Sequence, residues 1–123
     1  MLIVDTSAWV EHLYRSDARM LELLRQDQVL MHPFIIGEIA CVQMRQRALI
    51  LGQLQSMTAA AIATDADALA LLDSSMLMSR GIGYIGVHLL ASALLTDGTQ
   101  IWTRDRRLAA VADELGLAAP DSG

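Results

Sequence analysis

The sequence has one cysteine and no lysine. The first bears on the redox compartment of the protein, and the second on the kinds of phosphate site it can contain. Cys41 has no second cysteine to pair with, which favours a reducing, intracellular compartment, and its place in an apolar helical pattern predicts a packing role. Without lysine there is no glycine-rich phosphate loop of the G-x-x-x-x-G-K type. All nine basic residues are arginines, and one arginine can bind two phosphate oxygens at once. A solvated, charged surface explains these arginines equally well.

Long apolar runs and an excess of positive charge are also missing. No window reaches the ~18 uncharged apolar residues of a membrane span, and the apolar run at residues 1–4 is too short for a secretory signal. We therefore expect a soluble, cytoplasmic protein with no membrane partner. The net charge of -5 argues against a protein that coats nucleic acid non-specifically, but it leaves local phosphate contacts open.

What is present is an apolar chain of the size of one domain. Its 123 residues are 54% hydrophobic, which is enough for a continuous core. The sequence contains no internal repeat and no linker rich in proline or glycine. We predict a single domain over residues 1–118 and a short tail over residues 119–123.

Short apolar runs alternate with helical patterns along the chain. Strands are predicted at residues 2–4, 28–31 and 101–103, and helices at 6–14, 17–25, 33–46, 48–55, 64–81, 85–95 and 105–115. Thr6 and Ser7 are expected to cap the first helix. Thr64 and Asp67 resemble a capping box, and Gly81 is expected to end that long helix. Strands separated by helices predict an α/β fold, with a parallel sheet covered by helices on both faces.

Three acidic residues stand where chemistry is expected. Asp5 and Asp105 each follow a predicted strand, and ligands of parallel sheets bind beyond the carboxyl ends of the strands; the alternative for both is a helix N-cap. Glu38 has only apolar residues at its i±3 and i±4 helical positions, so it should be partly buried. It would then be neutralised, paired with an arginine across the fold, or used to bind a metal. Carboxylates of this kind suit Mg²⁺ or Mn²⁺.

Four segments, in this order and spacing, resemble the PIN domains of VapC-type toxins. They are LIVDTSAWVEHL, GEIA, GIGYIGVHLLASALL and IWTRDRRLAAVADELGL, and together the match covers nearly the whole chain. The resemblance implies a PIN-like α/β/α sandwich and a Mg²⁺-dependent (or Mn²⁺-dependent) ribonuclease. It also implies an RNA substrate, a VapB-like antitoxin as partner, and a homodimer that forms a heterotetramer or a larger assembly with the antitoxin.

The family's site has four acids, of which three match this chain. The resemblance makes Asp5, Glu38 and Asp105 the metal ligands and catalytic residues, while the remaining acid falls where this chain has Gly86. His88 is rotated by about 200° around the helix and Asp97 lies roughly 16 Å along it, so neither replaces that acid. We hypothesise that Gly86 weakens or abolishes RNA cleavage. The alternative interpretation is an inactive PIN fold that serves only to dimerise and to bind the antitoxin.

Two further groups of residues are predicted to support the site. The hydroxyls expected to steady the carboxylates through hydrogen bonds belong to Thr6, Ser7 and Thr103. The arginines expected to contact the RNA backbone, or equally an antitoxin acid or a surface partner, are Arg104, Arg106 and Arg107.

Overall fold

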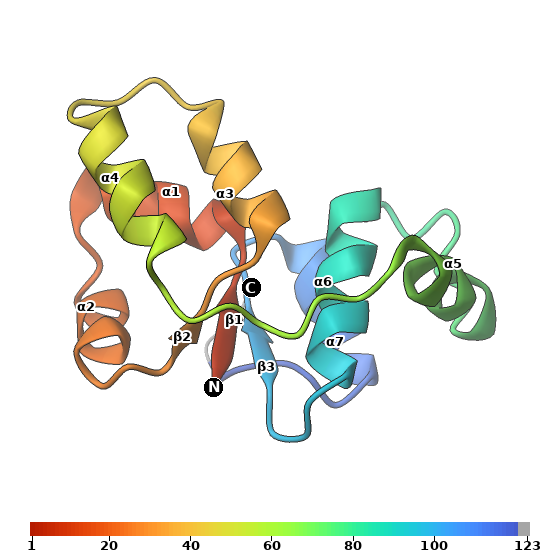
Figure 1. Cartoon of the computed structure of the whole chain (residues 1–123). Coiled ribbons are helices and arrows are strands. Elements are labelled where there is room, and N and C mark those ends of the chain that lie inside the picture. Colours follow the sequence, from red (N-terminus) through yellow and green to blue (C-terminus); the bar gives the residue numbers. More distant parts are fainter. Residues whose placement is uncertain (121–123) are drawn as a thin grey trace.

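The computed structural model describes residues 1–120 (Figure 1). Within them, a single parallel sheet has the order β2-β1-β3 and consists of β1 (Leu2–Val4), β2 (Val29–Leu30) and β3 (Gln100–Trp102). The helices are α1 (Thr6–Arg15), α2 (Ala18–Arg25), α3 (Pro33–Ala40), α4 (Arg47–Gln55), α5 (Asp65–Ser74), α6 (Tyr84–Leu94) and α7 (Arg106–Glu114). In Figure 1, α2 and α4 lie to the left of the strands, α3 lies above them, and α5 and α6 lie to the right. The predicted α/β fold is confirmed, and no helix of the described part is long and apolar enough to cross a membrane.

The middle strand β1 sets the geometry of the site. Its residues Ile3 and Val4 are fully buried, as expected of a parallel strand with both faces covered. Val4 is in register with Trp102 of β3, so the carboxyl ends of the two strands lie at the same edge of the sheet. The backbone N–H of Asp5 donates to the carbonyl of Trp102 at 2.8 Å. The residues that follow β1 and β3 are therefore neighbours.

Two isolated bridges continue the sheet beyond its outer strands. Met31 pairs with Ala59 beside β2, and Ile101 pairs with Ala118 beside β3. Ala119, expected to begin the tail, is buried, and its N–H donates to the carbonyl of Ile101 at 2.9 Å. The prediction was wrong at this residue because the chain after α7 returns to the sheet edge. Residues 121–123 of the predicted tail lie outside the described residues.

The helix predicted over residues 33–46 ends at Ala40 instead. The guanidinium of Arg47 donates to the carbonyl of Ala40 from Nη2 at 2.7 Å and from Nε at 3.1 Å, and so satisfies a carbonyl left open at the helix end. Gln46 then takes a left-handed conformation, with φ of 54°, and α4 begins at the next residue. Cys41 was wrongly predicted to pack in the core, because as the C-cap of this shortened helix it is exposed.

The helix predicted over residues 64–81 also ends early, at Ser74. Its capping box is confirmed, with Thr64 and Asp67 exchanging two hydrogen bonds of 3.0 Å. At the other end, Met76 adopts φ of 54°, and the N–H of Leu77 donates to the carbonyl of Leu72 at 2.9 Å. This left-handed turn ends the helix because it directs Leu77 into the core, where the residue is buried.

Candidate active site

A pocket of about 300 Å³ lies where the carboxyl ends of β1 and β3 meet the helices. Its lining residues come from four separate parts of the chain: Asp5, Thr6, Ser7, Glu38, Ile82, Gly83, Ile85, Gly86, Asp105 and Leu108. The structure thus brings the three acids predicted from the sequence into the wall of one pocket. Gly86, where a further acid was expected, lines the same pocket.

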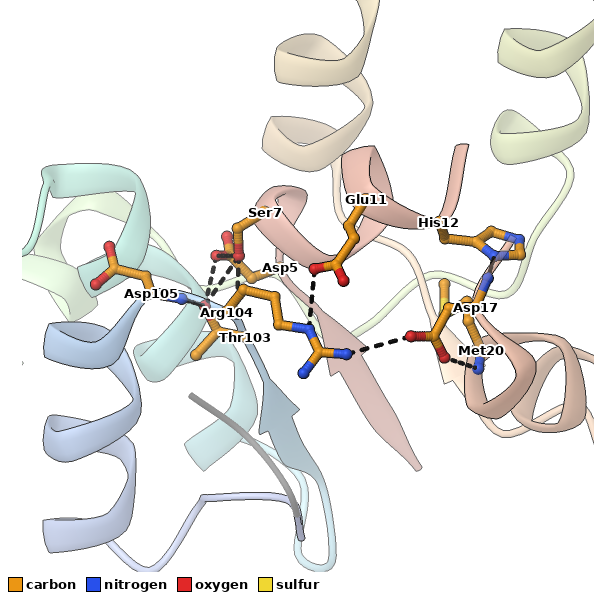
Figure 2. Close-up of polar contacts among 9 residues, drawn as sticks. All are labelled: Asp5, Ser7, Glu11, His12, Asp17, Met20, Thr103, Arg104 and Asp105. Atoms are coloured by element: carbon orange, nitrogen blue, oxygen red, sulfur yellow. Dashed lines mark hydrogen bonds and ion pairs between the residues drawn. The ribbon is translucent and has the colours of Figure 1, made fainter. Parts of the chain in front are cut away.

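Asp5 is held by hydroxyl groups from both sides of the strand edge. Its Oδ2 accepts hydrogen bonds from Ser7 Oγ at 2.9 Å and from Thr103 Oγ1 at 2.7 Å (Figure 2). The Ser7 hydroxyl in turn accepts the backbone N–H of Arg104 at 2.9 Å, and Thr103 Oγ1 accepts that of Asp105 at 3.0 Å. One carboxylate oxygen of Asp5 is therefore fixed, while Oδ1 has no hydrogen-bond partner among residues 1–120.

Glu38 is half-buried on α3 and points its carboxylate toward α1. Its Oε1 accepts the hydroxyl of Thr6 at 2.6 Å, and it has no arginine partner within the described chain. Thr6 and Ser7 were wrongly predicted to cap α1. The N-cap position belongs to Asp5, and no side chain caps this helix, because the two hydroxyls are already committed to the acids.

Asp105 caps a helix and also lines the pocket. It is the exposed N-cap of α7, and its Oδ1 accepts the backbone N–H groups of Arg107 at 2.9 Å and Leu108 at 3.2 Å. Its Oδ2 has no hydrogen-bond partner in the part of the chain that the structure describes. Capping therefore uses one carboxylate oxygen and leaves the other for a ligand in the pocket.

The donor set has a clear preference among metals. Asp5, Glu38 and Asp105 each offer one anchored and one open carboxylate oxygen, which is a hard donor set. No group of three or more His, Cys, Asp or Glu residues within 1–120 has the geometry to enclose a metal ion. Mg²⁺ is commonly held by only one or two carboxylates and keeps several of its waters. The residues therefore fit a hydrated Mg²⁺ or Mn²⁺ ion.

Gly86 lies in the first turn of α6, which contains no acidic residue. A Cβ atom built at this position would lie 3.4 Å from Leu108 Cδ1 and 3.8 Å from Ile82 Cβ, which are ordinary van der Waals distances. A carboxylate there would also benefit from the positive end of the helix dipole. The pocket thus has room for a side chain, and the local backbone does not demand glycine.

Arg104 does not line the acid pocket and is engaged in two ion pairs. Its Nε lies 3.2 Å from Glu11 Oε2 and its Nη2 lies 3.2 Å from Asp17 Oδ2, so it joins α1 to the start of α2 (Figure 2). Its guanidinium also lies 5.1 Å from the centre of the Trp102 ring. Arg104 was predicted to contact the RNA backbone, an antitoxin acid or a surface partner, and the structure shows the surface ion pair. Arg106 and Arg107 are exposed on the first turn of α7.

Comparison with known proteins was made on the whole chain. The PIN domain model matches residues 2–114. This chain belongs to the PIN-domain family. It is 40% identical over 118 residues to "Ribonuclease VapC32" of Mycobacterium tuberculosis, in strains CDC 1551 / Oshkosh and ATCC 25618 / H37Rv, across 96% of this chain and 95% of each relative. The resemblance to VapC-type PIN domains is confirmed, and no solved structure matches significantly.

Sequence reasoning missed an aromatic group formed by residues of α3 and α6, the two helices that also carry Glu38 and Gly86. The rings of Phe34 and Tyr84 contact the buried His88 ring edge-on, with centroid distances of 4.8 Å and 4.7 Å. Tyr84 stands between two residues that line the pocket, and Phe34 precedes Glu38 by four residues. The signal available in the sequence was the four-residue spacing of Phe34 from the candidate site residue Glu38.

A second, larger hollow lies away from the acids. It has a volume of about 540 Å³ and is lined by Val10, Leu13, Tyr14, Val42, Gln43, Met44, Arg45 and Ile50. We call it the α1–α4 groove, because its walls are α1, the start of α4 and the segment that precedes α4. It shares no lining residue with the acid pocket, so it is a separate surface of the PIN domain.

Proposed function

We propose that this PIN domain is the toxin of a VapBC-type toxin–antitoxin pair, an endoribonuclease that hydrolyses RNA phosphodiester bonds with Mg²⁺ or Mn²⁺. One observation carries the proposal: Asp5, Glu38 and Asp105 line a single pocket, each with one open carboxylate oxygen. The 40% identity to "Ribonuclease VapC32" supports the same activity.

In this proposal, one or two of the acids Asp5, Glu38 and Asp105 would bind the cation directly through their open oxygens, and the remaining acid would contact its waters. When bound, the cation supplies positive charge that activates a water molecule and offsets the charge developing on the leaving oxygen of RNA. The hydroxyls of Ser7 and Thr103 fix the orientation of Asp5, and groups that orient metal ligands in this way strongly affect metal affinity. Thr6 does the same for Glu38.

Gly86 limits the activity in this proposal, because the pocket has one carboxylate fewer to hold the cation. The test is RNA cleavage by wild type and by Gly86→Asp across a Mg²⁺ titration, with Gly86→Asn as a control of similar shape and no charge. We expect Gly86→Asp to cleave at least about tenfold faster than wild type. Adding Asp5→Asn should remove that cleavage. Equal rates for wild type and Gly86→Asp would contradict the role given to Gly86.

A second candidate function is supported by Gly86 and the α1–α4 groove together. There, the PIN domain only dimerises and binds a VapB-like antitoxin, whose apolar helix would lie in the groove against Val10, Leu13 and Ile50. Calorimetric titration with Mn²⁺ separates the candidates. A nuclease binds the ion, and binding weakens in Asp5→Asn, whereas a purely antitoxin-binding protein neither binds the ion nor cleaves RNA.

A further inference from the structure

We propose that Phe34 and Tyr84 form a stacking platform for a nucleobase of the RNA, beside the pocket that holds its scissile phosphate. This inference rests on the proposed function and adds a residue-level account of how the substrate is held. Both rings are large and apolar, yet 37% of Phe34 and 43% of Tyr84 are exposed. Aromatic rings in such positions are the usual means of holding bases of single-stranded nucleic acid.

The rings of Phe34 and Tyr84 form one surface because both contact the ring of His88. Each meets the His88 ring at a steep angle, 75° for Phe34 and 89° for Tyr84. His88 itself is only 2% exposed. The platform therefore consists of two open rings standing on a buried third ring, although α3 and α6 are far apart in the sequence.

Both rings are held before any ligand arrives. The Tyr84 hydroxyl donates to Asp65 Oδ1 at 2.9 Å, and His88 Nε2 contacts the same oxygen at 2.9 Å. The Tyr84 hydroxyl, and then His88, lower the pKa of Asp65, so this carboxylate is ionised at neutral pH and keeps its hold on Tyr84. The backbone N–H of Phe34 donates to His32 Nδ1 at 3.0 Å. Rings that are already ordered lose little conformational entropy when a base stacks on them.

The platform adjoins the acid pocket through the first turn of α6. Tyr84 lies in that turn between Gly83 and Ile85, which both line the pocket, although its side chain is turned about 200° around the helix from Gly86. Phe34 lies one helical turn before Glu38 on the same side of α3, a rise of about 6 Å. A base adjoining the phosphate in the pocket is therefore within reach of the rings.

The charge of the chain favours a base over the phosphate backbone as the main contact here. The net charge is -5, and Arg104 is already paired with Glu11 and Asp17. Electrostatic attraction to RNA is therefore weak, whereas stacking on an aromatic ring does not depend on net charge. The platform offers the affinity that the charge of the protein does not supply.

The test measures RNA binding by fluorescence anisotropy in EDTA, where cleavage is switched off, with a short single-stranded RNA. Phe34→Leu and Tyr84→Leu keep the apolar bulk and remove the ring, and each should weaken binding at least about fivefold. Tyr84→Phe keeps the ring but loses the hydrogen bond to Asp65, so it should weaken binding less than Tyr84→Leu does. Tyr14→Leu removes a ring that is 67% exposed in the α1–α4 groove, and it should also bind like wild type.

A photocrosslinking experiment with 4-thiouridine RNA gives a second readout, since a stacked base should crosslink to Phe34 or Tyr84. Wild-type affinity in both leucine variants, or a wild type that binds no RNA, would overturn the platform. So would leucine variants that only dissociate a dimer, because a second copy would then cover the rings. RNA binding that depends on the rings, without cleavage even in Gly86→Asp, would instead overturn the nuclease proposal and leave the platform standing.

Discussion

The hydroxyl of Thr103 donates a 2.7 Å hydrogen bond to Asp5 Oδ2, across 98 positions of sequence. The contact exists because β1 and β3 are parallel neighbours in register, so the residue after one strand meets the residue after the other. Thr103 is fully buried, and its Oγ1 also accepts the N–H of Asp105. One hydroxyl therefore connects the acid after β1 to the acid that begins α7.

Replacing Thr103 with valine should reveal this connection. Thr103→Val leaves Asp5 with one hydroxyl fewer and the N–H of Asp105 without its acceptor, so we expect a loss of about 1–3 kcal/mol in the free energy of unfolding. Mn²⁺ affinity should fall about tenfold or more. Urea denaturation and calorimetry measure the two effects. Thr103→Ser keeps the hydroxyl and should stay close to wild type in Mn²⁺ affinity; a serine variant as weak as the valine one would assign the effect to the lost methyl group.

Arg104 should matter more for stability than for RNA binding. Arg104→Met keeps much of the apolar stem over Trp102 but removes the ion pairs to Glu11 and Asp17. Because the guanidinium is partly exposed, we expect a loss of only about 1 kcal/mol in unfolding free energy, and less at high salt. Arg106→Met, on the exposed first turn of α7, is the matched control and should change stability little. A variant of Arg104 with normal stability and weakened RNA affinity would show instead that this arginine contacts RNA.

Stability should fall as the pH drops below neutral. Burial, and then the electrostatic interaction with His88, lower the pKa of His32, and burial lowers that of His12. A histidine whose folded pKa is depressed stays neutral in the fold, so its contribution is complete above the unfolded value near 6.5 and decreases as pH falls through it. Thermal unfolding between about pH 7.5 and 5 measures the slope. His32→Asn keeps a cap acceptor for Phe34 and should flatten it; an unchanged slope would exclude His32 as a source.

Two glycines near the pocket should respond oppositely to alanine. At Gly86 the added methyl finds ordinary contacts with Leu108, so Gly86→Ala should stabilise the fold by about 0.5–1 kcal/mol without increasing cleavage. At Gly81, φ is 80° and the methyl would lie 2.6 Å from the side chain of Arg107, so Gly81→Ala should destabilise it. Chemical denaturation compares the two directly. Destabilisation by Gly86→Ala would mean that the pocket wall at Leu108 does not accommodate the methyl group.

The sequence predicted those features that depend on local pattern. Apolar runs ended by Asp5 and near Asp105 located the strands and the acids, since the carboxyl ends of parallel strands share one edge. It did not predict where α3 and α5 end, because those points depend on Arg47 reaching back to Ala40 and on the burial of Leu77.

The sequence also did not predict which partner each side chain contacts. Thr6 and Ser7 have good capping chemistry, but their hydroxyls bond to Glu38 and Asp5, which no local pattern reveals. The contact of Phe34 with His88 likewise depends on how α3 and α6 pack together. The gathering of Asp5, Glu38 and Asp105 in one pocket was accessible from the sequence, whereas the partners of each side chain needed the fold.

The vacant space at Gly86 has an evolutionary consequence. Leu108, which faces that space, also donates its N–H to Asp105, so the wall that would receive a new carboxylate is already anchored to the existing acids. No second change is needed to admit the side chain. One codon change is therefore enough to place a carboxylate at this position without disturbing the wall of the pocket.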